Sequence, residues 1–415
     1  MIASTEWQGF HREIEDTLNK KFKGFRRSII KNLAHLIIAL VIVLRTPRGW
    51  YGRLSLSALA RGICTKGNVK TRYKRISRFL DSPFFNRSLL TKGFIELVLG
   101  KDKPKILPIM VDQTTVGGVE SVVASYATEG RALPLSIASF EKEEIVAGQN
   151  IFEETFLEKL SKNLKDINPL WIMDRGYARA RLFTILIKRK QLFIIRGRRM
   201  VLVQFHDEEG KTPQTSLGRL RHRLGVPRRY RNVLYQDEVK VKVDVIVYRE
   251  KGFKEPWFLV VPPNCENILP TELVVQYYRT RMNIETSFRD FKSCLGVRGL
   301  RLEVRKAERM DRLLAAMAIT YILLVALGVS SLGQQLRKEL EVLRKEPRHG
   351  TRRTLSVLSI ALMAVTDSFL LTLSNLMKIL AQCLVKLRET KVFEPRLSVV
   401  STTLERIYRS VLCPC

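Results

Sequence analysis

The sequence is poor in the residues that support several large classes of protein. Six cysteines are scattered through 415 residues without a Cys-x-x-Cys pair. Only five histidines are present, and none stands at a zinc-ligand spacing from a cysteine. These absences argue against a disulfide-stabilised secreted domain and against a structural zinc site. We therefore expect reduced thiols and a cytoplasmic location.

Acidic residues are scarce relative to basic ones. The chain holds 40 Asp and Glu against 72 Lys and Arg, which gives a formal net charge of +32. An excess of this size predicts a polyanionic partner, with nucleic acid as the first candidate and a membrane surface as the second. With 46% hydrophobic residues, the chain is long enough to bury more than one core, and about two to four domains are expected.

Long uncharged stretches are also few. Leu33 to Leu44 is too short to span a membrane, whereas Leu313 to Gly333 is long enough. The second stretch is rich in Ala, Ser and Thr and has basic sequence on both sides, so we interpret it as a buried helix. A basic protein anchored in a membrane is the alternative. No signal peptide is expected, because charged residues from Glu6 to Asp16 precede any apolar run.

The first hundred residues have apolar side chains at helical spacing. Within them, the pattern of Leu56 to Leu80 is typical of a helix-turn-helix, with a break at Thr65 to Asn68. The second helix would carry five basic residues that we predict to contact DNA. A solvated basic helix is the alternative for this segment. The five residues are Lys70, Arg72, Lys74, Arg75 and Arg78.

Two short apolar segments predict buried strands that each end in an aspartate. Ile106 to Val111 leads to Asp112, and Pro169 to Met173 leads to Asp174. The carboxyl ends of strands in an α/β sheet are where functional groups gather. An aspartate at the end of a strand can instead cap a helix or a turn. Arg175 and the following glycine are expected to turn the chain into the next helix.

The sequence pattern changes over residues 199–256, and we interpret this segment as a β-rich insertion. Valines alternate with polar residues from Val239 to Val247, which predicts a half-buried strand. The preceding Arg219 to Arg231 segment holds six arginines and no acid, and we predict a loop that touches DNA. The α/β pattern resumes with a strand at Trp257 to Val261. Beyond Leu300 we expect helices to roughly Arg409, with a break near residues 347–350.

Four functional side chains recur at helical spacing near residue 280. At about 100° per residue, Tyr278, Arg281, Glu285 and Lys292 fall on one narrow stripe of a continuous helix. A carboxylate flanked by two cations and a phenol could hold a metal ion while the cations grip phosphate oxygens. The alternative is an ordinary surface ladder of ion pairs that includes Arg289.

Asp112, Asp174 and Glu285 form a candidate trio. Their hard carboxylate oxygens, without an obligatory His or Cys, favour Mg²⁺ or Mn²⁺ over zinc. Two such ions can activate a water or a 3′-hydroxyl on one side of a phosphorus and stabilise the leaving oxygen on the other. The trio therefore predicts phosphodiester chemistry.

These motifs together resemble those of a known family. The chain is similar to the DDE transposases of bacterial insertion sequences, in the subgroup with a Tyr-Arg-Glu-Lys signature and a β-rich insertion before the glutamate. The resemblance covers nearly the whole chain. It is carried by Val111–Thr114, Gly130–Leu135, Asp174–Tyr177 and the spacing of Tyr278, Arg281, Glu285 and Lys292.

The resemblance implies an α/β fold, with a ribonuclease-H-like catalytic core split by the β-rich insertion and flanked by helical N- and C-terminal domains. The implied divisions are 1–100 for DNA binding, 101–198 and 257–305 for the core, 199–256 for the insertion, and 306–415 for a helical C-terminal domain that could dimerise.

The resemblance also implies roles for the site residues. Asp112, Asp174 and Glu285 would bind two metal ions, and Tyr278, Arg281 and Lys292 would contact DNA phosphates near the cut. We also predict that Arg175 contacts DNA. Family members that form a hairpin at the transposon end use a tryptophan to stack on a flipped base, and Trp257 has the expected spacing. A core tryptophan is the alternative.

The activity implied is that of a homodimer that binds the inverted-repeat ends in double-stranded DNA, hydrolyses a strand and joins its 3′-hydroxyl to target DNA. An inactive DNA-binding relic of such an enzyme is the alternative.

Overall fold

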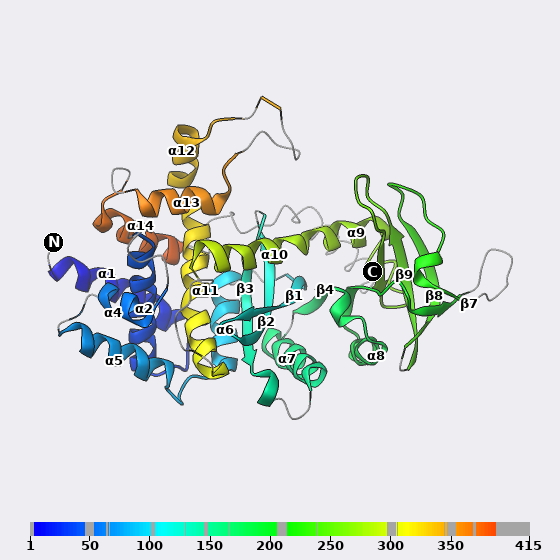
Figure 1. Ribbon diagram of the computed structural model, residues 1–415, viewed down its shortest axis with the longest axis horizontal. Helices are drawn as coiled ribbons and strands as arrows, with labels where there is room; N and C mark the ends of the chain where they lie inside the picture. Colours follow the sequence, from blue (N-terminus) through cyan, green and yellow to red (C-terminus); the bar gives the residue numbers. More distant parts are fainter. Residues whose placement is uncertain are drawn as a thin grey trace, which may run out of the picture.

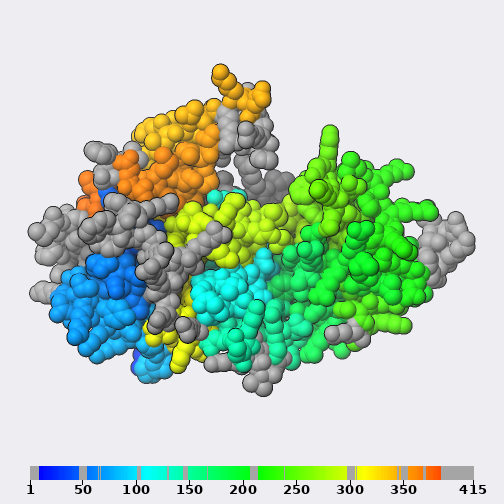
Figure 2. All heavy atoms as spheres, viewed as in Figure 1, coloured from blue at the N-terminus to red at the C-terminus, as the bar shows by residue number. Residues whose placement is uncertain are grey.

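The protein is elongated, with helices gathered at one end and β-structure at the other (Figure 1). The computed structural model describes residues 4–45, 54–63, 65, 67–100, 104–128, 130–144, 148–165, 167–205, 214–237, 239–296, 304, 306–343, 345–346, 354–367 and 371–386. The segment around residue 285 crosses the middle of the molecule between the two ends (Figures 1 and 2).

One sheet of ten strands runs through the described part of the chain, in the order β3-β2-β1-β4-β5-β10-β9-β8-β6-β7. The first half of the sheet, through β5, comes from residues before 199, and β10 joins it to the insertion strands. The strands are β1 (Ile106–Val116), β2 (Val119–Thr128), β3 (Arg131–Phe140), β4 (Asn168–Met173), β5 (Leu192–Arg196), β6 (Leu202–Gln204), β7 (Gln214–Ser216), β8 (Arg228–Gln236), β9 (Lys240–Tyr248) and β10 (Trp257–Val261).

The first three strands form an antiparallel meander. Gly117 and Gly118 make its first turn with φ of 58° and 84°, which only glycine adopts without strain. β4 and β5 then continue the sheet in parallel, so that β1 pairs with β2 on one side and with β4 on the other. Helix α7 (Gln149–Leu164) connects β3 to β4, and α8 (Ala180–Lys188) connects β4 to β5.

β1 is longer than the sequence suggested. We expected the strand to end at Asp112, and this is wrong: it continues to Val116. The extension is stabilised by antiparallel pairs with β2, from Asp112↔Val123 to Val116↔Val119. The parallel pairing with β4 stops at Val111↔Met173. The apolar run therefore ends where the pairing of β1 with β4 ends, while β1 itself continues along β2.

The insertion differs from its prediction in two respects. β9 is buried continuously from Val243 to Tyr248, so a half-buried strand is wrong for that stretch. The predicted Arg219–Arg231 loop also becomes strand β8 from Arg228 onward. In β8, Arg229 lies buried and pairs with Asp244 at 3.0 Å, with side chains 3% and 2% exposed. This arginine holds the insertion together and is not free to contact DNA.

Helices gather at the end of the molecule away from the insertion. The N-terminal group is α1 (Ser4–Lys21), α2 (Arg27–Arg45), α4 (Leu56–Gly62), α5 (Val69–Leu80) and α6 (Arg87–Val98). The C-terminal group is α11 (Ala307–Val329), α12 (Ser331–Leu340), α13 (Val357–Thr366) and α14 (Leu373–Lys386). The helical character of both regions agrees with expectation. The predicted break near 347–350 and the chain from 387 onward lie outside the described residues.

α11 is the central helix of this end. α2 and α11 are each long and apolar enough to cross a membrane, but the apolar window of α11 is wholly buried inside the protein. It packs against α2, α13, α14 and the edge strand β3. Gly328 allows the close approach of α13, because a Cβ there would collide with the carbonyl of Val357. The predicted buried helix at 313–333 is thus a core element as far as Val329. Its continuation to Gly333 is wrong, because Ser330 ends α11 and caps the start of α12.

The sheet divides the core into two layers. Side chains alternate between its faces, so that Met110, Ile172 and Ile194 lie in one layer while their neighbours Trp171 and Phe193 lie in the other. The first layer is covered by α9 (Thr271–Thr280) and α10 (Met282–Arg289). This packing fixes α9 and α10 across the strand ends where Asp112 and Asp174 lie.

Candidate active site

The register of two parallel strands places Asp112 and Asp174 side by side. The last pair of the β1–β4 ladder is Val111↔Met173, and the next residue on each strand is an aspartate. Both side chains are partly open to solvent, at 22% and 31% exposed. The backbone N–H of Gln113 donates to Asp112 Oδ1 at 2.8 Å and orients that carboxylate. The predicted convergence of two strand-end aspartates is present.

Arg281 brings the third acid to the pair. It lies between the end of α9 and the start of α10, and its side chain is only 6% exposed. Its Nη1 donates to Asp112 Oδ2 at 3.2 Å, and its Nη2 lies 4.0 Å from Asp174 Oδ2. The same Nη2 donates to Oε1 of Glu285, one helical turn later. Three carboxylates from distant segments therefore surround one guanidinium.

Tyr278 contacts two members of this cluster, Asp174 and Arg281. Its hydroxyl donates to Asp174 Oδ1 at 3.3 Å, and the guanidinium of Arg281 lies 5.9 Å from its ring centroid. Burial is the main reason that the pKa of the Tyr278 phenol is raised above its ordinary value. A neutral phenol that is 3% exposed orients Asp174 here. Its predicted contact with a DNA phosphate stays a prediction.

Trp257 packs edge-on against the same tyrosine. The ring centroids of Trp257 and Tyr278 are 5.1 Å apart, and Tyr248 and Phe253 lie at 5.8 and 6.2 Å from the indole. The indole is 9% exposed. In this conformation it serves as a core residue beside the site, which was the alternative reading, and its stacking on a flipped base stays a prediction.

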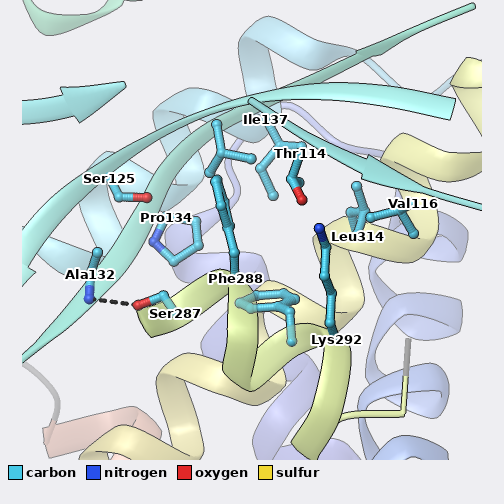
Figure 3. A pocket seen from close by; sticks show the side chains of 12 residues that line it. Thr114, Val116, Ser125, Ala132, Pro134, Ile137, Ser287, Phe288, Lys292 and Leu314 are labelled. Carbon is cyan, nitrogen blue, oxygen red and sulfur yellow. Dashed lines mark hydrogen bonds between the residues drawn. The ribbon is translucent and has the colours of Figure 1, made fainter. Parts of the chain in front are cut away.

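Lys292 departs from the predicted helical stripe. The regular helix ends at Arg289, and residues Asp290–Cys294 form a π-helical turn, so the prediction of one continuous α-helix is wrong. The wide turn is held by an ion pair of Asp290 with Arg131 Nε at 2.6 Å. Lys292 extends toward Thr114 on β1 and lines a cavity of about 30 Å³ (Figure 3).

The electrostatics of the trio depend on burial and on Arg281. The pKa of Asp112 is raised to about 6, mainly by burial and to a lesser extent by Asp174 and Glu285, while the Gln113 N–H and Arg281 oppose the shift. For Arg281, burial lowers the pKa, but Tyr278 and the three acids outweigh burial, so its pKa is raised overall. Arg281 stays fully charged and partly neutralises a cluster of like charges.

The oxygen atoms of the three carboxylates suit a divalent metal ion, but their arrangement in this structure does not form a metal site. Oxygen ligands alone suit Mg²⁺ or Mn²⁺. Within the described residues, however, no group of three or more His, Cys, Asp or Glu is placed to hold a metal ion. The guanidinium of Arg281 lies where the three carboxylates face one another. The trio therefore converges around an arginine, and a metal would need the same oxygens.

A basic cavity adjoins the site, and Arg175 is the one cation of its lining that the sequence predicted to contact DNA. Its volume is about 590 Å³, and Arg175, which follows Asp174, lines it. The run Arg196–Arg199 was the signal that could have revealed it, since three of its four residues are arginine. Glu255 is the one carboxylate in the lining. The cations are Arg175, Arg196, Arg198, Arg199, Arg249 and Lys254.

The predicted basic helix is α5. Ile76, Phe79 and Leu80 bury its apolar face, and Asn68 caps its start by accepting from Thr71 N at 2.9 Å. Three of the predicted DNA contacts, Lys70, Lys74 and Arg78, are exposed and follow one another at i, i+4 and i+8, whereas Arg72 and Arg75 are half-buried. The exposed row is available to a partner.

Comparison with known proteins agrees with part of the resemblance. Residues 144–323 match the family model described as the transposase DDE domain. The match includes Asp174, Arg281 and Glu285, whereas Asp112 lies outside it. It supports a transposase of the DDE type.

Two further comparisons add little. No curated protein matches the chain. Among solved structures, the chain is similar to the cryo-EM structure of the piggyBac transposase synaptic complex with hairpin DNA, at 11% identity and a TM-score of 0.41, over 87% of this chain and 78% of that one. A similarity this low does not establish a shared fold.

Proposed function

We propose that this protein is a DNA transposase of the insertion-sequence type. It would bind transposon ends, cleave them by metal-dependent phosphodiester hydrolysis and join the freed 3′-hydroxyl to target DNA. One observation carries the proposal: Asp112, Asp174 and Glu285, from three distant segments, converge on Arg281. The match to the transposase DDE domain supports the same class.

The three acids are the proposed metal ligands. They would hold two Mg²⁺ or Mn²⁺ ions, which when bound supply the activation of the attacking oxygen and the stabilisation of the leaving oxygen. Tyr278 would keep the carboxylate of Asp174 oriented through its 3.3 Å hydrogen bond. The partly exposed position of Glu285, at 44%, gives solvent and substrate access from the side of α10.

The proposed partner is double-stranded DNA, both as transposon ends and as target. A net charge of +32 supports a polyanion, and the basic cavity begins at Arg175, next to Asp174. The exposed cations of α5 offer a second contact surface, far from the trio along the molecule (Figure 1). We further propose a homodimer that pairs two ends, in the cytoplasm, where DNA is accessible.

The proposed core is ribonuclease-H-like. The contiguous order β3-β2-β1-β4-β5, with an antiparallel meander followed by parallel strands, supports it. The proposed domain divisions remain those of the sequence, with residues 199–256 as the insertion.

The test is cleavage of DNA taken from either side of the reading frame, in the presence of Mg²⁺ or Mn²⁺. Asp112→Ala, Asp174→Ala and Glu285→Ala should each abolish cleavage and leave binding of that DNA largely intact. Glu158→Ala, which removes a surface acid on α7 that pairs with Lys162 and Arg189, is the matched control and should cleave normally.

Retained cleavage by any one purified variant of the trio would remove that residue from the site. A wild-type protein that binds the flanking DNA but never cuts it would favour the inactive relic.

A further inference from the structure

Arg281 occupies the space that the proposed metal ions require. Its guanidinium contacts Oδ2 of Asp112 and Oε1 of Glu285, and lies 4.0 Å from Oδ2 of Asp174. These oxygens are the ones that face the centre of the trio. A cation of the protein and a cation from solution therefore compete for the same ligands.

The arginine is held mainly by the acids themselves. Its side chain is 6% exposed, yet its Nε has no hydrogen-bond partner. Besides the carboxylates, the guanidinium contacts the Tyr278 ring, whose centroid lies 5.9 Å away. Neutralising the carboxylates with another cation would remove most of what keeps Arg281 in place.

The backbone at Arg281 can stay in place while the side chain changes its conformation. Arg281 has helical dihedrals, φ −55° and ψ −33°, at the junction of α9 and α10. The helices on both sides are fixed by buried residues, among them Tyr277 and Ile284. A rotation about the side-chain bonds can therefore move the guanidinium out while Glu285 keeps its place.

We propose that Arg281 is an internal stand-in for the divalent cations: it holds the three carboxylates together before metal arrives and must withdraw for metal to bind. DNA assists the exchange, because a backbone phosphate offers the displaced guanidinium a bidentate partner. The inference rests on the proposed function, since it assumes that the trio binds metal. It adds that DNA and metal bind cooperatively through one residue.

Competition between Arg281 and metal ions predicts the direction in which the metal affinity changes when the arginine is removed. In free protein the carboxylates engaged by Arg281 are unavailable, so the apparent metal affinity is reduced by the fraction of molecules in the closed state. Removing the guanidinium should strengthen metal binding in the absence of DNA. Coupling is reciprocal, so metal should also tighten DNA binding in the wild type.

The experiment measures Mn²⁺ binding to the full-length protein by the loss of the free-ion electron paramagnetic resonance signal. Arg281→Met should bind Mn²⁺ about tenfold or more tightly than wild type without DNA, within the usual range of coupling between sites. A random-sequence duplex should tighten binding by wild type and have little effect on the variant. Arg279→Met, two residues earlier and paired with Glu250, is the matched control.

Arg281→Lys covers the case in which the methionine variant fails to fold. A lysine keeps the charge but lacks the guanidinium's fork of donors, so the Mn²⁺ affinity of this variant should lie between those of wild type and a fully released site. Equal or weaker binding than wild type by a folded Arg281 variant would overturn the proposal. So would an equal effect of DNA on wild type and variant.

Asp112→Asn separates this inference from the function on which it rests. If Asp112→Asn loses Mn²⁺ binding while the Arg281 variants match wild type, the metal site stands and the stand-in role falls. If wild type with DNA binds Mn²⁺ no better than Asp112→Asn, the trio is not a metal site, and the proposed function fails first.

Discussion

Because the pKa of Asp112 is raised, replacing its carboxylate with a neutral side chain should stabilise the folded protein relative to wild type, and more so as the pH rises. The perturbation is Asp112→Asn in metal-free protein with a chelator present. Burial raises the pKa from 3.8 to about 6, so the ionised form is disfavoured in the folded state. A shift of about two units corresponds to about 3 kcal/mol at pH values above 6.

The sign follows from proton linkage. Below pH 3.8 both the folded and unfolded states are protonated, and the group contributes nothing. Between 3.8 and 6 the folded state keeps a proton that the unfolded state has lost, so wild-type stability falls as the pH rises. About half of the penalty is present at pH 5, and all of it at pH 8. The free energy of unfolding of Asp112→Asn relative to wild type should therefore increase by about 1.5 kcal/mol from pH 5 to pH 8.

Denaturant titrations of both proteins at the two pH values supply the measurement. Glu272→Gln, which removes an exposed carboxylate from α9, is the matched control. A difference between Asp112→Asn and wild type that stays flat, or shrinks toward pH 8, would refute the assignment of Asp112 as a buried and disfavoured carboxylate.

Two other predictions concern the insertion and the basic cavity. Asp244→Ala would leave its arginine partner buried and unpaired, and should cost about 3 to 5 kcal/mol in the free energy of unfolding; Glu266→Ala, at a half-exposed pair, should cost about 1 kcal/mol or less. A large loss in the second variant and none in the first would contradict this assignment. Replacing Arg199 and Lys254 by alanine should weaken DNA binding and reduce the salt slope of log K by up to about 2, if each cation contacts one phosphate. An unchanged slope, or an equal loss for Lys162→Ala on α7, would remove the cavity from the DNA contact surface.

Part of the sheet could be predicted from local patterns. Apolar runs located β1 and β4, and the strand at Trp257–Val261 matches β10 residue for residue. What the patterns could not provide is which strands become neighbours. The extension of β1 past Asp112 depends on pairing with β2, and the burial of β9 depends on β8 and β10 on either side. Such pairings are decided by packing between distant segments.

The site was predictable as a set of residues, but its geometry was not. Spacing identified Asp112, Asp174 and Glu285, and the structure brings all three to Arg281. The surface-pair reading was also partly correct, because Arg281 and Glu285 do form an i, i+4 pair. Sequence could not show that Asp112 shares this arginine. Nor could it place Lys292, because the π-helical turn depends on the buried partners of Asp290.

The unbroken sheet has a mechanical consequence. β10 bonds to β5 on one side and to β9 on the other, so the insertion and the strands that carry the aspartates form one hydrogen-bonded body. Any movement of the insertion relative to Asp112 and Asp174 would therefore have to bend this sheet or break the hydrogen bonds between β5 and β10.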